Sequence, residues 1–190
     1  MSDNILKIRD LSVNYQTDRG KLKALRNVDL DISRGSIVGV VGESGCGKST
    51  LITSIIRQLD SNADIPNGSI EFEKQDLLKL SLDKMRNISG TKISIVFQNP
   101  MSTLNPVISI GRQMIDIQYR DKISKKTKKQ RSIDMLTKVG IPDPHIQFNQ
   151  YPHELSGGMQ QRVSIAMALQ AGPSLLIADE PTTALDATLE

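Results

Sequence analysis

The residues best suited to chemistry in this chain form a glycine-rich stretch at 42–50, which reads Gly-Glu-Ser-Gly-Cys-Gly-Lys-Ser-Thr. An apolar run at 37–41 precedes it and a second apolar segment, at 51–56, follows it. This is the strand–loop–helix context of a phosphate-binding loop. Its glycines allow consecutive backbone N–H groups to point at one centre, and the start of a helix adds positive potential there. The alternative is a glycine-rich turn without a ligand, which the flanking segments disfavour.

The polar residues of this stretch have defined roles in such a loop. Lys48 is placed to neutralise charge on the β- and γ-phosphates, and the Ser49 hydroxyl to hold Mg²⁺. The stretch therefore predicts binding of a nucleoside triphosphate. The candidate contacts to this ligand are Gly42, Ser44, Gly45, Cys46, Gly47, Lys48, Ser49 and Thr50.

Two acidic residues follow an apolar strand pattern at 175–178. Asp179, at the carboxyl end of that strand, is placed to bind Mg²⁺ together with Ser49. Glu180 is a candidate general base that polarises the attacking water. Gln98 ends another apolar strand pattern, where its amide would reach Mg²⁺ or the water. On local grounds an ordinary polar strand end is an equally good interpretation of Gln98.

A third chemical pattern is Ser156-Gly157-Gly158, which precedes a helical pattern at 160–171. Ser156 can cap that helix, and the open backbone of the two glycines makes its N-terminus receptive to anions. A plain helix cap is the simpler interpretation, and physical reasoning alone does not exclude it.

Composition restricts the class of protein. The chain has 190 residues with 24% charged and 38% apolar side chains, and its apolar runs are far shorter than the ~20 residues needed to span a bilayer. The single cysteine, Cys46, excludes a disulfide framework or a cysteine metal cluster. The first residues lack the pattern of a signal peptide, so we expect a cytoplasmic protein. The basic run at 122–131 lacks interleaved aromatics, which favours a solvated helix face over nucleic-acid or lipid binding.

The hydrophobic patterns predict an α/β fold. Strand patterns at 5–16, 22–25 and 28–32 indicate an antiparallel hairpin, and the apolar run within 36–41 indicates a strand buried on both faces. A helix at about 49–59, a turn at Asn67-Gly68, a strand at 69–72, a short helix at 80–86 and a strand at 93–97 follow. Helices at 110–119 and 124–139 then interrupt the alternation. We therefore predict a nucleotide-binding core at 1–98 and 159–190, and an inserted helical subdomain at 99–158.

Taken in order, these patterns resemble the ATP-binding-cassette ATPase family. The resemblance covers Tyr15, the loop at 42–50, Gln98, Leu-Ser-Gly-Gly-Met at 155–159, the acidic strand end and Ala184-Leu185-Asp186. It implies a P-loop NTPase (RecA-like) core with an N-terminal antiparallel β subdomain, ATP and Mg²⁺ as cofactors, and Tyr15 stacked on adenine. It further implies a head-to-tail dimer of ATPase subunits, in which Ser156, Gly157, Gly158 and Asp186 contribute to the partner's nucleotide site.

The sequences at 97–106 and 151–159 look like those of the ATPase subunits of oligopeptide, dipeptide and nickel permeases. That resemblance implies transmembrane permease subunits as partners of the helical subdomain and an indirect link to a solute-binding protein. It also implies a peripheral location on the cytoplasmic side of the inner membrane, and no nucleic acid. The alternatives are a soluble ATPase of the same family that acts on nucleic acid or ribosomes, and a nucleotide-binding module that does not hydrolyse ATP.

Two positions depart from the family pattern. Met159 stands where the family usually has glutamine. The family's switch histidine would follow Asp186, whereas both histidines here, His145 and His153, precede the signature and the chain stops at Glu190. We therefore expect a truncated form with an unpaired sheet edge and weak hydrolysis.

Overall fold

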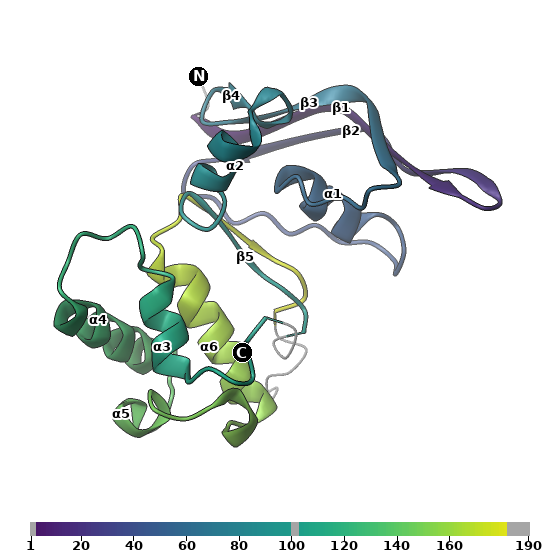
Figure 1. The fold of residues 1–190 in the computed structure, drawn as a ribbon. Helices are drawn as coiled ribbons and strands as arrows, with labels where there is room; N and C mark the ends of the chain where they lie inside the picture. Colours follow the sequence, from purple (N-terminus) through teal and green to yellow (C-terminus); the bar gives the residue numbers. More distant parts are fainter. Residues whose placement is uncertain (1–2, 100–102, 182–190) are drawn as a thin grey trace. The chain divides into compact units, whose positions relative to one another are not determined.

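The computed structural model describes residues 3–99 and 103–181 of the chain (Figure 1). Its internal contacts divide the chain into two compact units, Met1–Ser89 and Gly90–Glu190. The predicted division into a core and an insertion at 99–158 remains a prediction.

A four-stranded antiparallel sheet with the strand order β2-β1-β3-β4 forms the first unit. The strands are β1 (Asn4–Thr17), β2 (Gly20–Ser33), β3 (Ala63–Phe72) and β4 (Gln75–Asp76). The predicted hairpin is confirmed, with Thr17 opposite Gly20. The two patterns at 22–25 and 28–32 belong to one strand. A bulge at Asp10 and Asn27, which both adopt positive φ, shifts the register between the two patterns.

The predicted turn at Asn67-Gly68 is wrong, because β3 runs straight through these residues. Gly68 has φ +109° and lies where the register between β1 and β3 shifts, so the glycine marks a β-bulge. A Cβ at this position would lie 2.5 Å from the Cα of Leu11 and 2.8 Å from the carbonyl oxygen of Asp10. The glycine thus serves a close approach of two strands, which a sequence pattern cannot distinguish from a turn.

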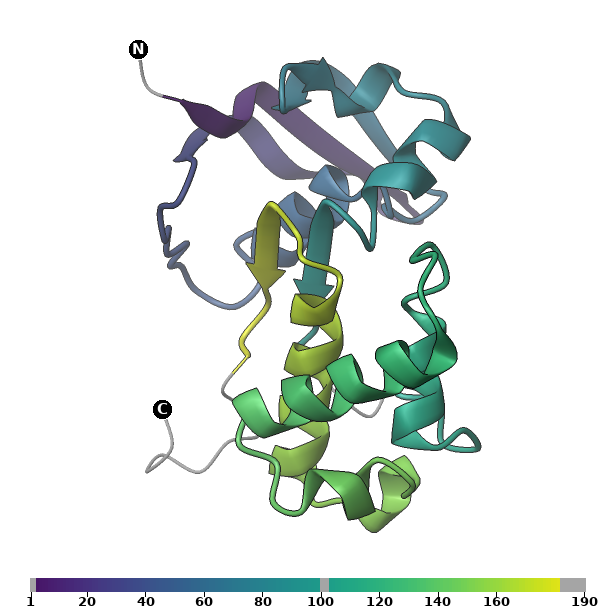
Figure 2. The ribbon, with the colours of Figure 1, turned by 90° about the vertical axis from the view of Figure 1, so that its left-hand side faces the viewer.

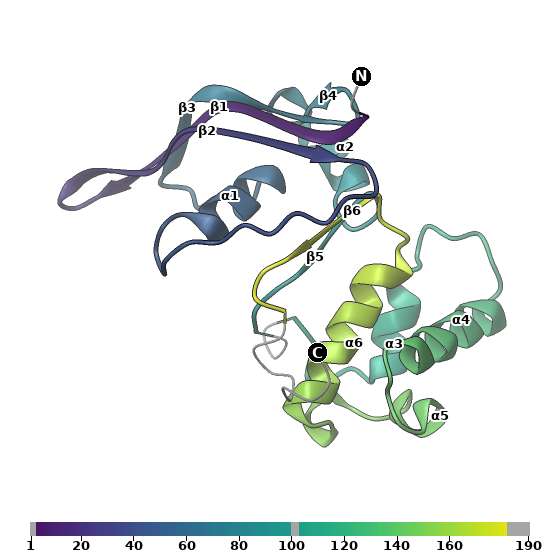
Figure 3. The ribbon, with the colours of Figure 1, turned by 180° about the vertical axis from the view of Figure 1, so that it is seen from behind.

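The helices of this unit are short. They are α1 (Lys48–Ile55), the 3₁₀ turn η1 (Leu77–Lys79) and α2 (Leu82–Ile88), which confirms the predicted helix at 80–86 within a few residues. Helix α1 lies beneath the sheet (Figures 1 and 3) and ends before the predicted residue 59. Arg57 explains the early end, because it adopts φ +55° and its guanidinium donates to the carbonyl oxygens of Leu77 and Leu80.

The predicted buried strand at 36–41 is not present. These residues form no strand, and Ile37 and Val41 are fully exposed. Figure 2 shows this stretch as a bare dark-blue loop. A strand needs backbone partners at its edges, and the four strands that the structure describes in this unit pair only with each other. The apolar pattern indicated a preference for burial, but no described strand supplies the partner.

Two parallel strands and a group of helices form the second unit. The strands β5 (Ile93–Val96) and β6 (Leu175–Ala178) match the predicted segments, and Val96 lies opposite Ala178. The helices are α3 (Ile110–Asp116), α4 (Lys125–Lys138), α5 (Pro144–Gln147), the 3₁₀ turn η3 (Pro152–Glu154) and α6 (Gly157–Gln170). Between residues 98 and 150, the described part of the chain contains no strand, as predicted. The buried core of these helices consists of Leu104, Ile110, Met114, Ile133, Leu136, Ile141, Phe148, Leu155, Val163 and Ala166.

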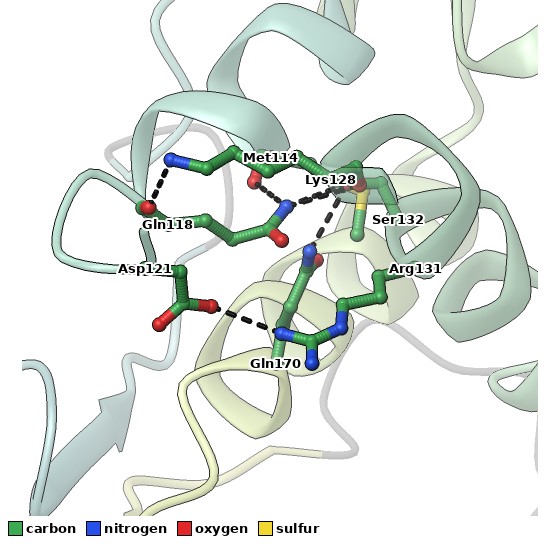
Figure 4. A network of polar contacts seen from close by, with 7 residues as sticks. All are labelled: Met114, Gln118, Asp121, Lys128, Arg131, Ser132 and Gln170. Carbon is green, nitrogen blue, oxygen red and sulfur yellow. Dashed lines mark hydrogen bonds and ion pairs between the residues drawn. The ribbon is translucent and has the colours of Figure 1, made fainter. Parts of the chain in front are cut away.

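Buried amides connect three of these helices (Figure 4). The amide nitrogen of Gln118, which follows α3, donates to the hydroxyl of Ser132 on α4 at 3.1 Å. Gln170 on α6 donates to the same hydroxyl at 3.0 Å. Ser132 is fully buried, so its two donors satisfy a group whose burial would otherwise be costly.

The basic run at 122–131 is mostly exposed, in agreement with a solvated helix face. Some of its cations are nevertheless engaged within the unit, and Figure 4 shows two of them. The ammonium of Lys128 donates to the carbonyl oxygen of Gln118 at 2.5 Å, and Arg131 pairs with Asp121 at 3.1 Å. These contacts join the start of α4 to the loop before it.

Gly20 and Gly68 both have φ +109°, but only Gly68 lies against a neighbouring strand. Their replacement by alanine should therefore lower the free energy of unfolding by different amounts. Gly20→Ala should lower the free energy of unfolding by about 1 kcal/mol, because only the positive φ opposes a side chain there. Gly68→Ala adds the conflict with β1 and should cost a further ~1–3 kcal/mol. Urea unfolding of the two variants measures the difference. Equal losses would contradict the close approach of β3 to β1.

Candidate functional site

The glycine-rich stretch turns into α1 through two glycines with positive φ. Gly45 and Gly47 have φ +79° and +103°, and the N–H of Leu51 donates to the carbonyl oxygen of Gly47 at 2.9 Å as α1 begins. A Cβ on Gly47 would lie 2.8 Å from Leu25 Cδ2 and 2.9 Å from the carbonyl oxygen of Ala24, both on β2. The loop is therefore seated against β2 in a way that only glycine permits.

Lys48 lies across this loop. Its ammonium donates to the carbonyl oxygens of Gly42 and Glu43 at 2.7 and 2.9 Å, and lies 3.8 Å from the sulfur of Cys46. Gly47 has no side chain with which to cap α1, so no capping oxygen competes with an anion at this helix end. The arrangement places one cation and a helix start without a side-chain cap in the same loop, which suits phosphate groups.

The remaining residues predicted to contact nucleotide in this unit are accessible. Ser44, Cys46 and Ser49 are exposed. Tyr15 lies on β1 opposite Leu22 and Ala63 and is half-buried. Its stacking on adenine remains a prediction.

In the second unit, the ends of β5 and β6 bring two predicted residues into contact. The N–H of Asp179 donates to the carbonyl oxygen of Val96 at 2.9 Å, which extends the parallel ladder beyond β6. Just past this bond, the amide nitrogen of Gln98 donates to a carboxylate oxygen of Glu180. The structure therefore joins the two residues that sequence reasoning assigned separately to the attacking water.

Glu180 has an unfavourable backbone conformation. Its φ is +47° although it carries a side chain and precedes Pro181, two features that each disfavour this region. Such a conformation costs on the order of 1–3 kcal/mol and persists only where the surroundings hold it. Gln161, on α6, supplies one such hold, because its amide nitrogen donates to the carbonyl oxygen of Pro181 at 2.9 Å.

Sequence reasoning missed Gln161. It stands in a polar run, Gln160-Gln161-Arg162, where glutamine normally faces solvent. The available signal was its helical spacing from Ser164 and Ala168, which are buried on the same helix, and that spacing does not say what a buried amide would bind.

The predicted cap of α6 is confirmed. The hydroxyl of Ser156 accepts a hydrogen bond from the N–H of Met159 at 3.3 Å, and the helix begins at Gly157. Gln160 reinforces this end, since its amide donates to the carbonyl oxygens of Pro152 and Leu155 at 3.0 and 3.1 Å. The contact of Ser156, Gly157 and Gly158 with a partner's nucleotide remains a prediction. Asp186 lies outside the described residues.

The donors for the predicted Mg²⁺ are oxygens. Ser49 and Asp179 offer a hydroxyl and a carboxylate, the ligand types that Mg²⁺ prefers, and fit an ion that retains waters and phosphate oxygens as its other ligands. They belong to different units, so their joint site remains a prediction. Over 3–99 and 103–181 the structure contains no group of three or more His, Cys, Asp or Glu arranged to hold a metal. Within the same ranges, every helix is too short or too polar to cross a membrane.

Comparison with known proteins gives the family. A model described as ABC transporter matches residues 25–183. The chain belongs to the ABC transporter family. The glycine-rich loop, Gln98, the capped helix α6 and the acidic end of β6 all lie within the matched residues.

Individual relatives agree with this family. The chain is 44% identical over 188 residues to the oligopeptide transport ATP-binding protein OppD of Bacillus subtilis, a match that covers 98% of this chain and 52% of OppD. It is 45% identical to the dipeptide transport ATP-binding protein DppD of the same organism, covering 99% of this chain and 57% of DppD. The chain thus spans about half the length of these relatives. The dimeric structure of the ATP-binding cassette MJ0796 bound to ADP and Pi is similar to it with a TM-score of 0.85 and 30% identity, over 97% of this chain and 77% of MJ0796.

The capping contact of Ser156 leads to a prediction about stability. Ser156→Ala should lower the free energy of unfolding by ~1 kcal/mol, because the N–H of Met159 loses its side-chain acceptor. Ser156→Asp should keep most of the stability. Ser124→Ala, which removes the equivalent cap of α4, is the matched control and should cost a similar amount. Full stability of Ser156→Ala would show that the hydroxyl does not cap α6 in solution.

Proposed function

We propose that this chain binds ATP with Mg²⁺, hydrolyses it, and serves as an ATPase subunit of a membrane importer for peptides or similar small solutes. The observation that supports this most directly is the loop at 42–50, where the Lys48 ammonium lies across two positive-φ glycines at the start of α1, an arrangement suited to phosphate. The similarity to OppD and DppD supports the choice of transport over other uses of ATP.

In this proposal the loop binds the phosphates. Lys48 moves its hydrogen bonds from the carbonyl oxygens of Gly42 and Glu43 to phosphate oxygens, which stabilises the negative charge that develops at the γ-phosphate. Bound Mg²⁺ would neutralise further phosphate charge, with Ser49 and Asp179 as its protein ligands. Tyr15 contributes a ring for the adenine base.

Hydrolysis is proposed to depend on the end of β6. Glu180 accepts a hydrogen bond from the attacking water and orients it for in-line attack on the γ-phosphate. Gln98 donates to the same carboxylate, so it restricts the orientation of the base. Gln98 lies two residues past the end of β5, so it is also placed to pass changes at the carboxylate to the helices that follow it in the chain.

The proposed partners follow from the family and the relatives. They are two transmembrane permease subunits, a second ATPase subunit in a head-to-tail dimer completed by Ser156, Gly157 and Gly158, and indirectly a solute-binding protein. The chain would act at the cytoplasmic face of the membrane. No observation favours the alternative of a soluble ATPase that acts on nucleic acid.

Removal of the loop ammonium tests nucleotide binding. At ~100 times its dissociation constant, Mg-ATP should stabilise the wild-type chain by ~2.7 kcal/mol and raise its melting temperature. Lys48→Ala should lose most of this shift, because the phosphates lose their nearest cation. Lys84→Ala, which removes an exposed lysine on α2, should keep it. An equal shift in Lys48→Ala and the wild type would refute the assignment.

Neutralisation of the proposed base separates binding from chemistry. Glu180→Gln should retain the thermal shift with Mg-ATP but lower phosphate release by about 10²–10⁴-fold, because the amide cannot accept the proton. It should also lengthen the life of an ATP-bound dimer, measured by light scattering. The control is Glu71→Gln, whose carboxylate forms only a surface ion pair on β3 and whose loss should leave turnover unchanged. Undiminished turnover in Glu180→Gln would exclude this residue as the base.

A further inference from the structure

Gln161 is a buried polar residue whose side-chain amide donates a hydrogen bond outside its own helix. Its side chain is fully buried on α6, and its amide nitrogen donates to the carbonyl oxygen of Pro181, across twenty positions in sequence. Its amide oxygen is buried without a protein partner among the described residues. Burial of an amide is unfavourable unless hydrogen bonds compensate it. An apolar side chain would fill the same space without the desolvation cost of an amide, so packing alone does not account for a glutamine here.

The Pro181 carbonyl lies directly after the turn that contains the proposed base. The preceding residue, Glu180, has φ +47° and is followed by a proline, so the turn is not the one that its residues prefer. Contacts on both sides hold the turn: the bond from the Asp179 N–H to Val96 before it, the bond from Gln98 to the carboxylate, and the bond from Gln161 after it. The bond from Gln161 comes from α6.

The neighbouring glutamine connects this turn to the signature segment. Gln160 donates to the carbonyl oxygens of Pro152 and Leu155, immediately before the Ser156 cap. Gln160 thus binds the segment before α6, and its neighbour Gln161 binds the Pro181 carbonyl. Because both are bound to a single rigid helix, a displacement of the Ser156 end of α6 would also displace the acceptor at Pro181.

We propose that Gln161 is a positioning residue: through its bond to the Pro181 carbonyl it fixes the backbone of Glu180 and couples the carboxylate to the signature end of α6. The inference rests on the proposed function in one respect, since the importance of the carboxylate depends on Glu180 acting as the base. The bond itself, and the hold that it provides on the turn, do not depend on that function.

The test compares two substitutions on the same helix. Gln161→Met has a similar length to glutamine and removes the donor, and Gln170→Met likewise removes a donor, the one that binds Ser132. Hydrogen exchange of the Asp179 amide, which bonds to Val96, reports the turn without any need for nucleotide. Exchange should accelerate at least tenfold in Gln161→Met and remain at the wild-type rate in Gln170→Met. Equal exchange rates in the wild type and Gln161→Met would overturn the inference.

Kinetics on the same proteins distinguish positioning from a general loss of structure. Gln161→Met should lower kcat for ATP at least tenfold and change the affinity for Mg-ATP less than twofold, while Gln170→Met changes neither. A parallel loss of affinity, kcat and melting temperature in Gln161→Met would indicate a structural role only and contradict the proposal. A wild-type chain with no turnover would refute the proposed hydrolysis. The exchange result would then decide by itself whether Gln161 holds the turn.

Discussion

The parallel pairing of β5 with β6 is the interaction on which the geometry of the second unit depends. Since parallel strands end at the same edge, the pair Val96–Ala178 places the residues that follow each strand next to one another. Gln98 therefore reaches Glu180 although 82 positions separate them in sequence. The hydrogen bond from the Asp179 N–H to Val96 carries the register one step beyond the strands, and the unfavourable turn at Glu180 begins where that ladder ends.

In the first unit the comparable constraint is the close approach of the loop to β2. Gly47 has no room for a Cβ beside Ala24 and Leu25, and its φ of +103° turns the chain into α1. Lys48 then folds back over the loop onto its carbonyl oxygens. These contacts involve only residues 24–51, so the conformation suited to phosphate is specified locally, within a single unit.

The parts of the structure that sequence reasoning predicted well are those that local chemistry determines. The loop, the Ser156 cap and the strands β5 and β6 each follow from a short pattern of residues. The errors arise where the outcome depends on a partner distant in sequence. Asn67-Gly68 has the composition of a turn but occupies a bulge, because β1 approaches it too closely for a side chain. Glutamine is a residue type typical of protein surfaces, but Gln161 is buried, because its hydrogen-bond acceptor is the distant Pro181.

The exposed run at 36–41 shows what the conformation of the loop requires. Its apolar residues predicted a buried strand leading into the loop, yet they lie exposed and unpaired among the described strands, while the glycine conformations and the start of α1 immediately after them are intact. The loop therefore keeps its contact with β2 although the segment before it is unpaired among the described strands. It follows that the groups proposed to bind phosphate and the groups proposed to activate water are held by separate constraints, one at β2 and one at the ends of β5 and β6. Substitutions at the end of β6 should for this reason alter turnover with little effect on affinity, whereas loss of Lys48 should alter both, because its ammonium also stabilises the charge that develops at the γ-phosphate.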